Sequence, residues 1–326
     1  MAKTGGTQTS IGIGIETTAG TPVAATHFPK WTEFSFQGIA EKEMLTSQRG
    51  VRSSSSDSMI RRKFSRGNLG IIPNGDIAPI FFYLALGSKS SGTIVDGTYT
   101  HTFTVQNANA SMKTATVLAE DGAIVTERFA NCVVNQLDLA VSDGYAKMTA
   151  QMLGGFPDTG TVTESYAKEN EYAYHQMTVK FDTSLTAAAS ASATPLKAFN
   201  LTLNNNVLLD EAFLSGSNTP AAGGFVAGRF TATGSYSLHF SDTTELAKYK
   251  ANTKNAAIVT FTGPVTGGGT TAESITIKLG RLILTGEPKV YNLDGLLILN
   301  QTFSVEYEAT DKEVQVVIVN DTASYA

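Results

Sequence analysis

QLDLAVSDGYAKMTAQM (Gln136–Met152) contains the pattern that decides the fold. Apolar and polar side chains alternate in QLDLAV and again in AKMTAQM, so each run is expected to form a strand with one apolar and one polar face. Between the two runs, SDG (Ser142–Gly144) has the residue types of a tight turn. The stretch therefore predicts an antiparallel hairpin with one buried face.

The same period of two recurs along the whole chain. The further runs are SIGIGIE (Ser10–Glu16), TEFSFQG (Thr32–Gly38), YTHTFTV (Tyr99–Val105), QMTVKF (Gln176–Phe181), FNLTLN (Phe199–Asn204), TGSYSLHF (Thr233–Phe240), SITIKLG (Ser274–Gly280), TFSVEY (Thr302–Tyr307) and EVQVVIV (Glu313–Val319). Residues typical of turns separate them. We therefore expect an antiparallel, all-β protein with a minor α-helical part.

Two segments predict helices instead of strands. In DIAPIFFYLALG, Asp76 is expected to cap the helix, Pro79 lies in its first turn, and Gly87 is expected to end it. Apolar residues at helical spacing would form one stripe of this helix. In SDTTELAKYKANT, Asp242 and Glu245 resemble a capping box. We expect one short helix at each place.

The bulk composition limits the possible functions. With 326 residues, of which 42% are hydrophobic, the chain can bury one or two cores. Its net charge of −5 lacks the overall basic excess that is usual for a general nucleic-acid binder. The single cysteine, Cys132, excludes an intrachain disulfide, and we expect it to be a small buried residue. The longest apolar block, Ile77–Gly87, is too short to cross a bilayer, so no membrane contact is expected and the protein would fold in a cytosol.

The order of predicted elements repeats at a shift of about 165 residues, which takes Phe34 to Phe199 and the first helix to the second. At nearly the same shift, QLDLAV falls on TFSVEY. The polar, turn-rich stretch Pro157–Glu171 suits a linker between two like units. We therefore expect two tandem β-sandwich or barrel domains, residues 1–160 and 161–326, each carrying one short helix.

Each half has a long segment after its second strand, at residues 40–67 and 206–229. The first is basic, because Glu41–Gly67 contains seven Arg or Lys against three Asp or Glu. This composition is compatible with three roles: a segment that binds nucleic acid, a disordered or merely solvated loop, or an arm that holds a neighbouring subunit. The run of four serines would keep such an arm flexible until it docks.

No catalytic, cofactor or metal site is expected. The four histidines, His27, His101, His175 and His239, have no metal-ligand spacing. GIGIETTAG is rich in glycine but has no following helix to form a phosphate site, and no G-x-S-x-G sequence is present. The single tryptophan, Trp31, argues against a cleft that stacks sugars. An enzyme is therefore not expected.

Several of these stretches together resemble the tail tube (major tail) proteins of bacteriophages with long non-contractile tails. They are IGIGIETTAGTPV, the basic segment, PNGDIAPIFFYLALGS followed by GTYTHTFTV, and ERFANCVVNQLDLAVSDGYAKMTAQMLGG, with KAFNLTLNNNVLL and GRFTATGSYSLHFSDTTELAKYK in the second half. The resemblance implies sandwich domains, six of which close a ring around a channel for the viral genome. Rings stack, and a long loop of each domain reaches the next ring. With two domains per chain, a trimeric ring is favoured over a hexamer of whole chains.

The resemblance also implies sites and partners. The basic segment would be the contact between rings, with Arg52, Met59, Ile60, Arg61, Arg62, Lys63, Phe64 and Arg66 as the contact residues. The partners would be other copies of the chain and other tail proteins (tape measure, terminator and tail tip). Viral DNA would pass through the lumen without specific binding. The protein would be assembled in the host cytoplasm into the virion tail. A surface adhesin or a carbohydrate-binding double β-sandwich is the alternative.

Overall fold

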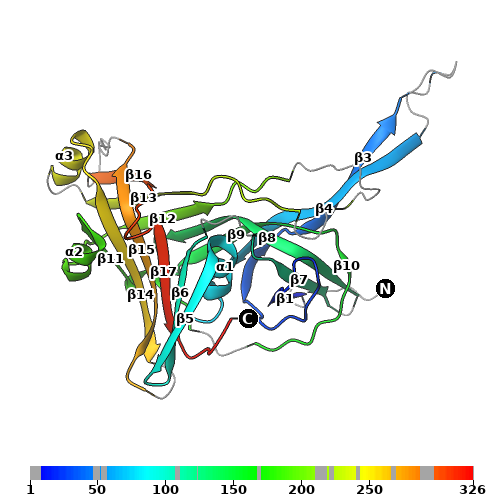
Figure 1. The fold of residues 1–326 in the computed structure, drawn as a ribbon, viewed down its shortest axis with the longest axis horizontal. Helices are drawn as coiled ribbons and strands as arrows, with labels where there is room; N and C mark the ends of the chain where they lie inside the picture. Colours follow the sequence, from blue (N-terminus) through cyan, green and yellow to red (C-terminus); the bar gives the residue numbers. More distant parts are fainter. Residues whose placement is uncertain are drawn as a thin grey trace.

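The computed structural model describes residues 9–46, 52, 57–106, 111–122, 124–166, 170–209, 219, 224–239, 243–265, 269–286 and 297–325. In this part of the chain, strands dominate and the helices are short (Figure 1). The expected fold class, all-β with a minor α-helical part, is confirmed.

The first half contains ten strands and one helix in its described part. They are β1 (Thr9–Ile15), β2 (Trp31–Phe34), β3 (Gln37–Leu45), β4 (Asp57–Ile71), α1 (Ala78–Leu86), β5 (Gly87–Val95), β6 (Thr98–Val105), β7 (Ala115–Asp121), β8 (Val125–Val141), β9 (Lys147–Gly154) and β10 (Asp158–Thr159). The stretch quoted first forms the end of β8, a turn, and β9, with Gly144 at a φ of 83° in the turn. The hairpin expected there is confirmed.

The second half has the following elements in its described part. They are the 3-10 turn η2 (Tyr174–Gln176), β11 (Met177–Asp182), α2 (Leu185–Ser190), β12 (Ala198–Asn204), β13 (Thr231–His239), α3 (Thr244–Lys250), β14 (Asn255–Val265), β15 (Ala272–Leu284), β16 (Ile298–Val305) and β17 (Val314–Asn320).

The strands form two layers around one core. Eight strands pair antiparallel in the order β2–β4–β9–β8–β12–β13–β16–β15, which we call the wide sheet. The second layer consists of two groups of paired strands. In one group β1 pairs with β7, and β7 pairs with β8. In the other group the strands pair in the order β11–β14–β15–β17–β6–β5. The long strands β8 and β15 take part in both layers. A single large apolar cluster fills the space between them.

Helix α1 lies inside this core. Its neighbours are β5, β6 and β8, and eight of its nine residues are buried, so it has no polar face and the expected single apolar stripe is wrong. Its N-cap residue is Ile77 instead of Asp76, because the Asn74 side chain already accepts hydrogen bonds from the backbone N–H groups of Asp76 and Ile77. Gly87 ends the helix at a φ of 86°, as predicted.

The other two helices are short surface elements. α3 forms where a second helix was predicted, with Thr243 at its N-cap and no side-chain cap; Asp242, expected there, lies outside the described residues. α2 was not predicted, because its small residues resembled a loop. Ser184 caps it by accepting a hydrogen bond from the Ala187 N–H, and its buried face packs on β14.

The pairing pattern of the first half recurs in the second half. The pairs β1–β7, β7–β8, β8–β9, β9–β4 and β4–β2 have the counterparts β11–β14, β14–β15, β15–β16, β16–β13 and β13–β12. A register shift also recurs. Between β7 and β8 it follows the pair Ala115↔Cys132, and between β14 and β15 it follows the pair Asn255↔Leu282. The pairings therefore match β8 to β15, whereas the sequence spacing matched the end of β8 to β16.

The hairpin β5–β6 has no described counterpart in the second half, which accounts for this difference. Its extra length reduces the offset between matching residues along the later strands. Between β3 and β12 the offset is 165, because equivalent registers followed from β8 and from β15 lead to Gln37 and to Thr202. The two halves join where β8 pairs with β12, from Val141↔Phe199 to Gln136↔Asn204, and where β6 pairs with β17.

Candidate functional site

The basic segment is an ordered hairpin where the structure describes it. Residues 39–45 of β3 pair with residues 57–64 of β4 and project from the body as a ribbon, which we call the arm (Figure 1). Eight residues of β4 in this ribbon correspond to a reach of about 26 Å. These residues are therefore strands and not a loop, while Ser53–Ser56, the run that was expected to be flexible, lies outside the described part.

The predicted contact residues lie in different environments. Met59 is 64% exposed, Ile60 is half-buried, and Phe64, at the base of the arm, is 4% exposed. Arg52 is exposed and outside any strand. Arg61 is exposed at a register shift between two pairs of the arm. Of the three apolar residues expected to anchor the arm, Met59 therefore presents the most surface.

Arg62 is engaged inside its own chain. Its guanidinium lies 2.9 Å from the Glu41 carboxylate across the ribbon and donates a second hydrogen bond to the Leu209 carbonyl. The hydrogen bond from Arg62 lowers the pKa of Glu41. The Arg62 side chain also lies over the Phe64 ring, 4.9 Å from its centroid. Arg62 therefore stiffens the base of the arm, and was not recognised in this role from the sequence.

The two remaining basic residues lie at the root of the arm. Lys63 approaches the Phe156 ring, 5.2 Å from its centroid, and Arg66 is exposed on β4 opposite Gln37. Lys63 and Arg66 are three residues apart on β4 and point to opposite faces, so both sides of the arm's root carry positive charge.

A second candidate surface is the face of the wide sheet that points away from the core. Its side chains are mostly uncharged and polar, because each strand alternates them with buried apolar residues. Its uncharged polar side chains and Asp138 are Asn68, Thr149, Gln151, Gln136, Asp138, Asn200, Thr202, Asn204, Thr231, Thr233, Ser235, Ser237, Asn300, Thr302 and Ser304. Three further charged residues, Glu33, Arg66 and Lys147, lie on the same face toward the β2 side of the sheet. We call this surface the polar face. Sequence reasoning noted the alternation but assigned the face no role.

Hydrogen bonds connect the polar face across strands. Asp138 accepts bonds from the Thr202 hydroxyl at 2.6 Å and from the Gln136 amide at 2.8 Å. The Asn204 amide donates to Gln136, and the Ser237 hydroxyl donates to Asn300 at 2.6 Å. These side chains form hydrogen bonds with one another, and the surface that they present to water is polar with few charges.

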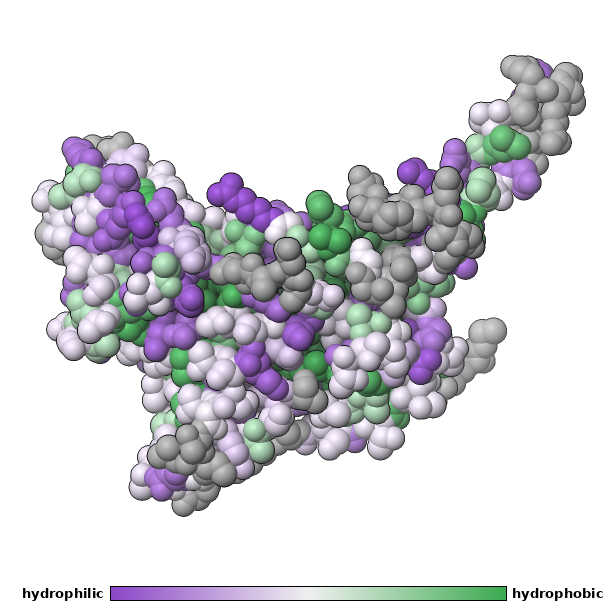
Figure 2. Space-filling view, in the orientation of Figure 1, coloured by the Kyte–Doolittle hydropathy of each residue, from purple (hydrophilic) through white to green (hydrophobic). Residues whose placement is uncertain are grey.

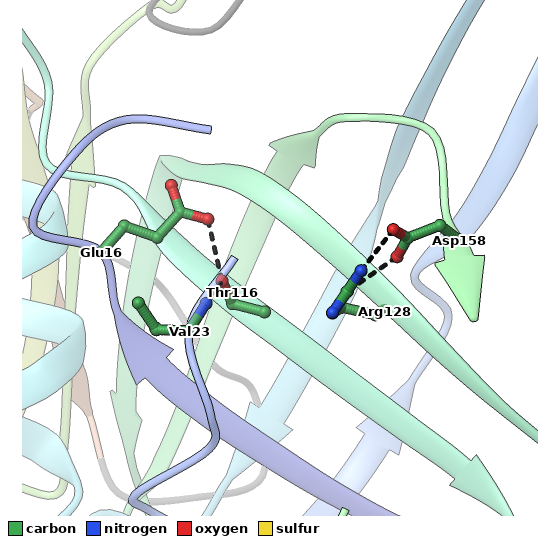
Figure 3. A network of polar contacts seen from close by, with 5 residues as sticks. All are labelled: Glu16, Val23, Thr116, Arg128 and Asp158. Carbon is green, nitrogen blue, oxygen red and sulfur yellow. Dashed lines mark hydrogen bonds and ion pairs between the residues drawn. The ribbon is translucent and has the colours of Figure 1, made fainter. Parts of the chain in front are cut away.

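The glycine-rich stretch near the N-terminus has a structural role. A Cβ on Gly14 would lie 2.3 Å from the Ala24 carbonyl oxygen, so the close approach of this chain segment requires glycine. The buried Glu16 carboxylate accepts hydrogen bonds from the Thr116 hydroxyl (Figure 3) and from the backbone N–H groups of Gly20 and Asn131. This network ties residues 16–23 to β7.

The stretch proposed as a linker, Pro157–Glu171, is attached to the first half. Arg128 of β8 donates two hydrogen bonds to the Asp158 carboxylate, at 2.8 and 2.6 Å (Figure 3). Glu171 pairs with Lys30 at 2.6 Å.

The described residues contain no group of three or more His, Cys, Asp or Glu side chains that could hold a metal ion. Cys132 is fully buried, and burial raises the pKa of its thiol, so it is inert. Burial lowers the pKa values of His27 and His101. No helix in the described part of the chain could cross a membrane.

One of two comparisons with known proteins places the chain in a family. A search of curated proteins found no match. A family model described as phage tail tube protein matches residues 6–308, which include most of both halves, the arm and the whole wide sheet. The chain therefore belongs to the phage tail tube protein family and is a structural component of the virion tail.

Proposed function

We propose that the chain assembles with copies of itself into stacked rings that form the tail tube, through which the viral genome passes on ejection. The observation that carries this proposal is the wide sheet. It contains four strands from each half, joined inside the chain by the pairing of β8 with β12. In the described residues, β2 pairs on one side only, with β4, and so leaves an open edge.

The joint inside the chain supports a similar joint between chains. Because the pairings of the two halves match, β2 and the start of β3 correspond to β12, the strand that bonds to β8. We infer that the halves are two tube domains, residues 1–160 and 161–326, and that the open β2 edge bonds to the other end of the wide sheet in a neighbouring copy. Closure of three such chains gives six units and leaves no sheet edge.

The polar face suits the wall of the channel, since the opposite face of the wide sheet is covered by the core. Hydroxyl and amide side chains bonded to one another make up most of this face and offer DNA phosphates no cation, and cations are what would hold DNA in place. The two cations on the face, Arg66 and Lys147, are matched in number by the carboxylates of Glu33 and Asp138. Asp138 adds a carboxylate near the middle of this wall. The open ends of such a tube would contact the other tail proteins.

Electron microscopy of the purified protein, combined with the native mass of one ring, tests the proposal. We expect hollow rings or tubes and a ring mass of three 34.5 kDa chains. A ring of six chains would contradict the two-domain count but keep the tube. A monodisperse monomer with affinity for a glycan would contradict the tube and support an adhesin.

A further inference from the structure

A short segment follows the last strand of the second half and lies on the first half. That strand, β17, pairs with β6 of the first half from Gln315↔Thr104 to Asn320↔Tyr99. Residues 321–325, which we call the tail, leave β17 and run back toward the first half (Figure 1). Figure 2, in the same orientation, shows a mostly hydrophilic to neutral surface around this joint. The tail therefore crosses the joint between the two halves on the side of the second layer.

Tyr325 is the anchor of the tail, and its side chain is completely buried. The His27 ring stacks on the Tyr325 ring with 5.8 Å between centroids, and the His101 ring meets it edge-on at 5.1 Å. The phenol oxygen accepts a 2.6 Å hydrogen bond from the Asn320 amide, which also donates to the Gly75 carbonyl at 2.6 Å. The ring is therefore enclosed between two imidazoles, with its polar end hydrogen-bonded.

Further hydrogen bonds hold the tail on the first half. The Thr322 hydroxyl donates to the Asp76 carboxylate at 3.0 Å, and the Thr322 carbonyl lies 2.8 Å from Nε2 of His101. The Lys89 ammonium donates to the Tyr325 carbonyl. These partners belong to β5, β6 and the segment before α1, so the tail is tied to three separate parts of the first half. Together with His27 and Gly75, they form what we call the tail site.

The hydrogen bonds of His101 fit a neutral imidazole. Nε2 faces a carbonyl and so carries the proton, which leaves Nδ1 to accept from the Ser91 hydroxyl at 3.1 Å. A second proton would place a positive charge in a buried site near the Lys89 ammonium, which already has Lys113 as a neighbour. Burial lowers the pKa of His101, and Lys89 acts in the same direction; burial also lowers the pKa of His27.

Two carboxylates also lie near the tail site. Burial raises the pKa of Asp76, whose charge is used by the Thr322 hydroxyl, and Asp321 is exposed. Within the described residues, neither carboxylate forms a hydrogen bond with His27 or His101. The Tyr99 ring lies 6.5 Å from the His101 ring between centroids. A proton taken up by either imidazole is therefore not neutralised by a paired carboxylate.

We propose that the tail is an acid-sensitive latch, which closes the joint between the halves while bound and is released when His27 and His101 take up protons. Release exposes these rings to water, where an imidazole has a pKa of about 6.5. Below that pH the released state binds more protons than the bound state, so the latch weakens as the pH falls, by up to about tenfold per pH unit for each imidazole. The latch is a property of the single chain and goes beyond the proposed function.

Fluorine NMR of the unassembled chain labelled with 3-fluorotyrosine tests the latch. The Tyr325 resonance is identified by its loss in Tyr325→Phe, and the resonance of the buried core residue Tyr236 by its loss in Tyr236→Phe. From about pH 7.5 to about pH 5, a second Tyr325 resonance is expected to grow at the position of a water-exposed tyrosine, while Tyr236 stays unchanged. If both resonances move together, the chain unfolds as a whole and the local latch is overturned.

Substitution of the two histidines identifies the protons. His101→Gln keeps an N–H group that can donate to the Thr322 carbonyl but cannot be protonated near neutral pH. The logarithm of the released-to-bound ratio is expected to change with pH at a slope of about two in the wild type, about one in His101→Gln or His27→Gln, and near zero in the double variant. His175→Gln, at an exposed position, is the control and should keep the wild-type slope. An unchanged slope in the double variant would overturn the role of the histidines, and a Tyr325 resonance that stays single throughout would overturn the latch.

Discussion

Thr202 on β12 donates a 2.6 Å hydrogen bond to Asp138 on β8, across the joint between the two halves of the chain. The bond joins residues that are 64 positions apart and lie directly opposite each other in the wide sheet. Removing this bond therefore tests the pairing of β8 with β12, which we propose as the model for the pairing between copies.

Thr202→Val is expected to lower the free energy of unfolding by about 1 kcal/mol, because it removes a hydrogen bond to a carboxylate while keeping a β-branched side chain. Urea unfolding of the unassembled chain measures the change. The matched control is Thr233→Val on the neighbouring strand, where the side chain is exposed. Equal effects of the two substitutions would show that the bond across the joint adds no stability.

Glu16→Gln is expected to cost about 2 kcal/mol of unfolding free energy. The buried carboxylate accepts from the Thr116 hydroxyl and from the N–H groups of Gly20 and Asn131, and an amide would point a donor at one of these donors. Guanidinium unfolding measures the loss. Glu33→Gln, at an exposed position, should change it by less than about 0.5 kcal/mol. A similar small effect at both positions would contradict the network.

Stability is expected to fall on acidification below about pH 6.5, in part because of His101. Burial lowers the pKa of this fully buried imidazole, and the nearby Lys89 ammonium acts in the same direction. The unfolded chain then binds more protons than the folded chain between the two pKa values, so stability rises with pH in that window. Unfolding measured from pH 5 to 8 should have a smaller slope in His101→Gln than in His239→Gln, an exposed control. An unchanged slope would remove His101 from the explanation.

Replacement of Arg61, Arg62 and Lys63 by Ser is expected to leave rings but to weaken their stacking severalfold, as seen by sedimentation and electron microscopy. Arg62→Ser alone should loosen the arm, because it removes the Glu41 pair. Arg61→Ser alone should leave the ribbon intact. Unimpaired tube growth in the triple variant would count against a role of the arm in stacking.

Asn200→Lys combined with Thr302→Lys places two cations per chain on the exposed polar face. If this face lines the channel, tubes of this variant should retain duplex DNA, and retention should weaken steeply with salt. Thr178→Lys, with an exposed side chain on β11 in the other layer, is the matched control. Equal DNA retention by the two kinds of tube would show that the polar face does not line the channel.

Much of this architecture is encoded locally and was predicted from the sequence. The alternation in QLDLAV and AKMTAQM, the turn between them, and Gly87 as the end of α1 each depend on near neighbours in the chain. The same holds for the all-β class, and the resemblance to tail tube proteins follows from the order of such local elements.

The tertiary structure alone decided how these elements meet. Long-range pairing converts the basic segment into a ribbon, engages Arg62 with Glu41, and buries α1 on nearly every side. It also sets Gln37 and Thr202 in equivalent places while matching β8 to β15, which spacing alone did not reveal. The physical reason is that a period of two specifies which face of a strand is apolar, whereas the choice of partner and register depends on side chains far away in the sequence.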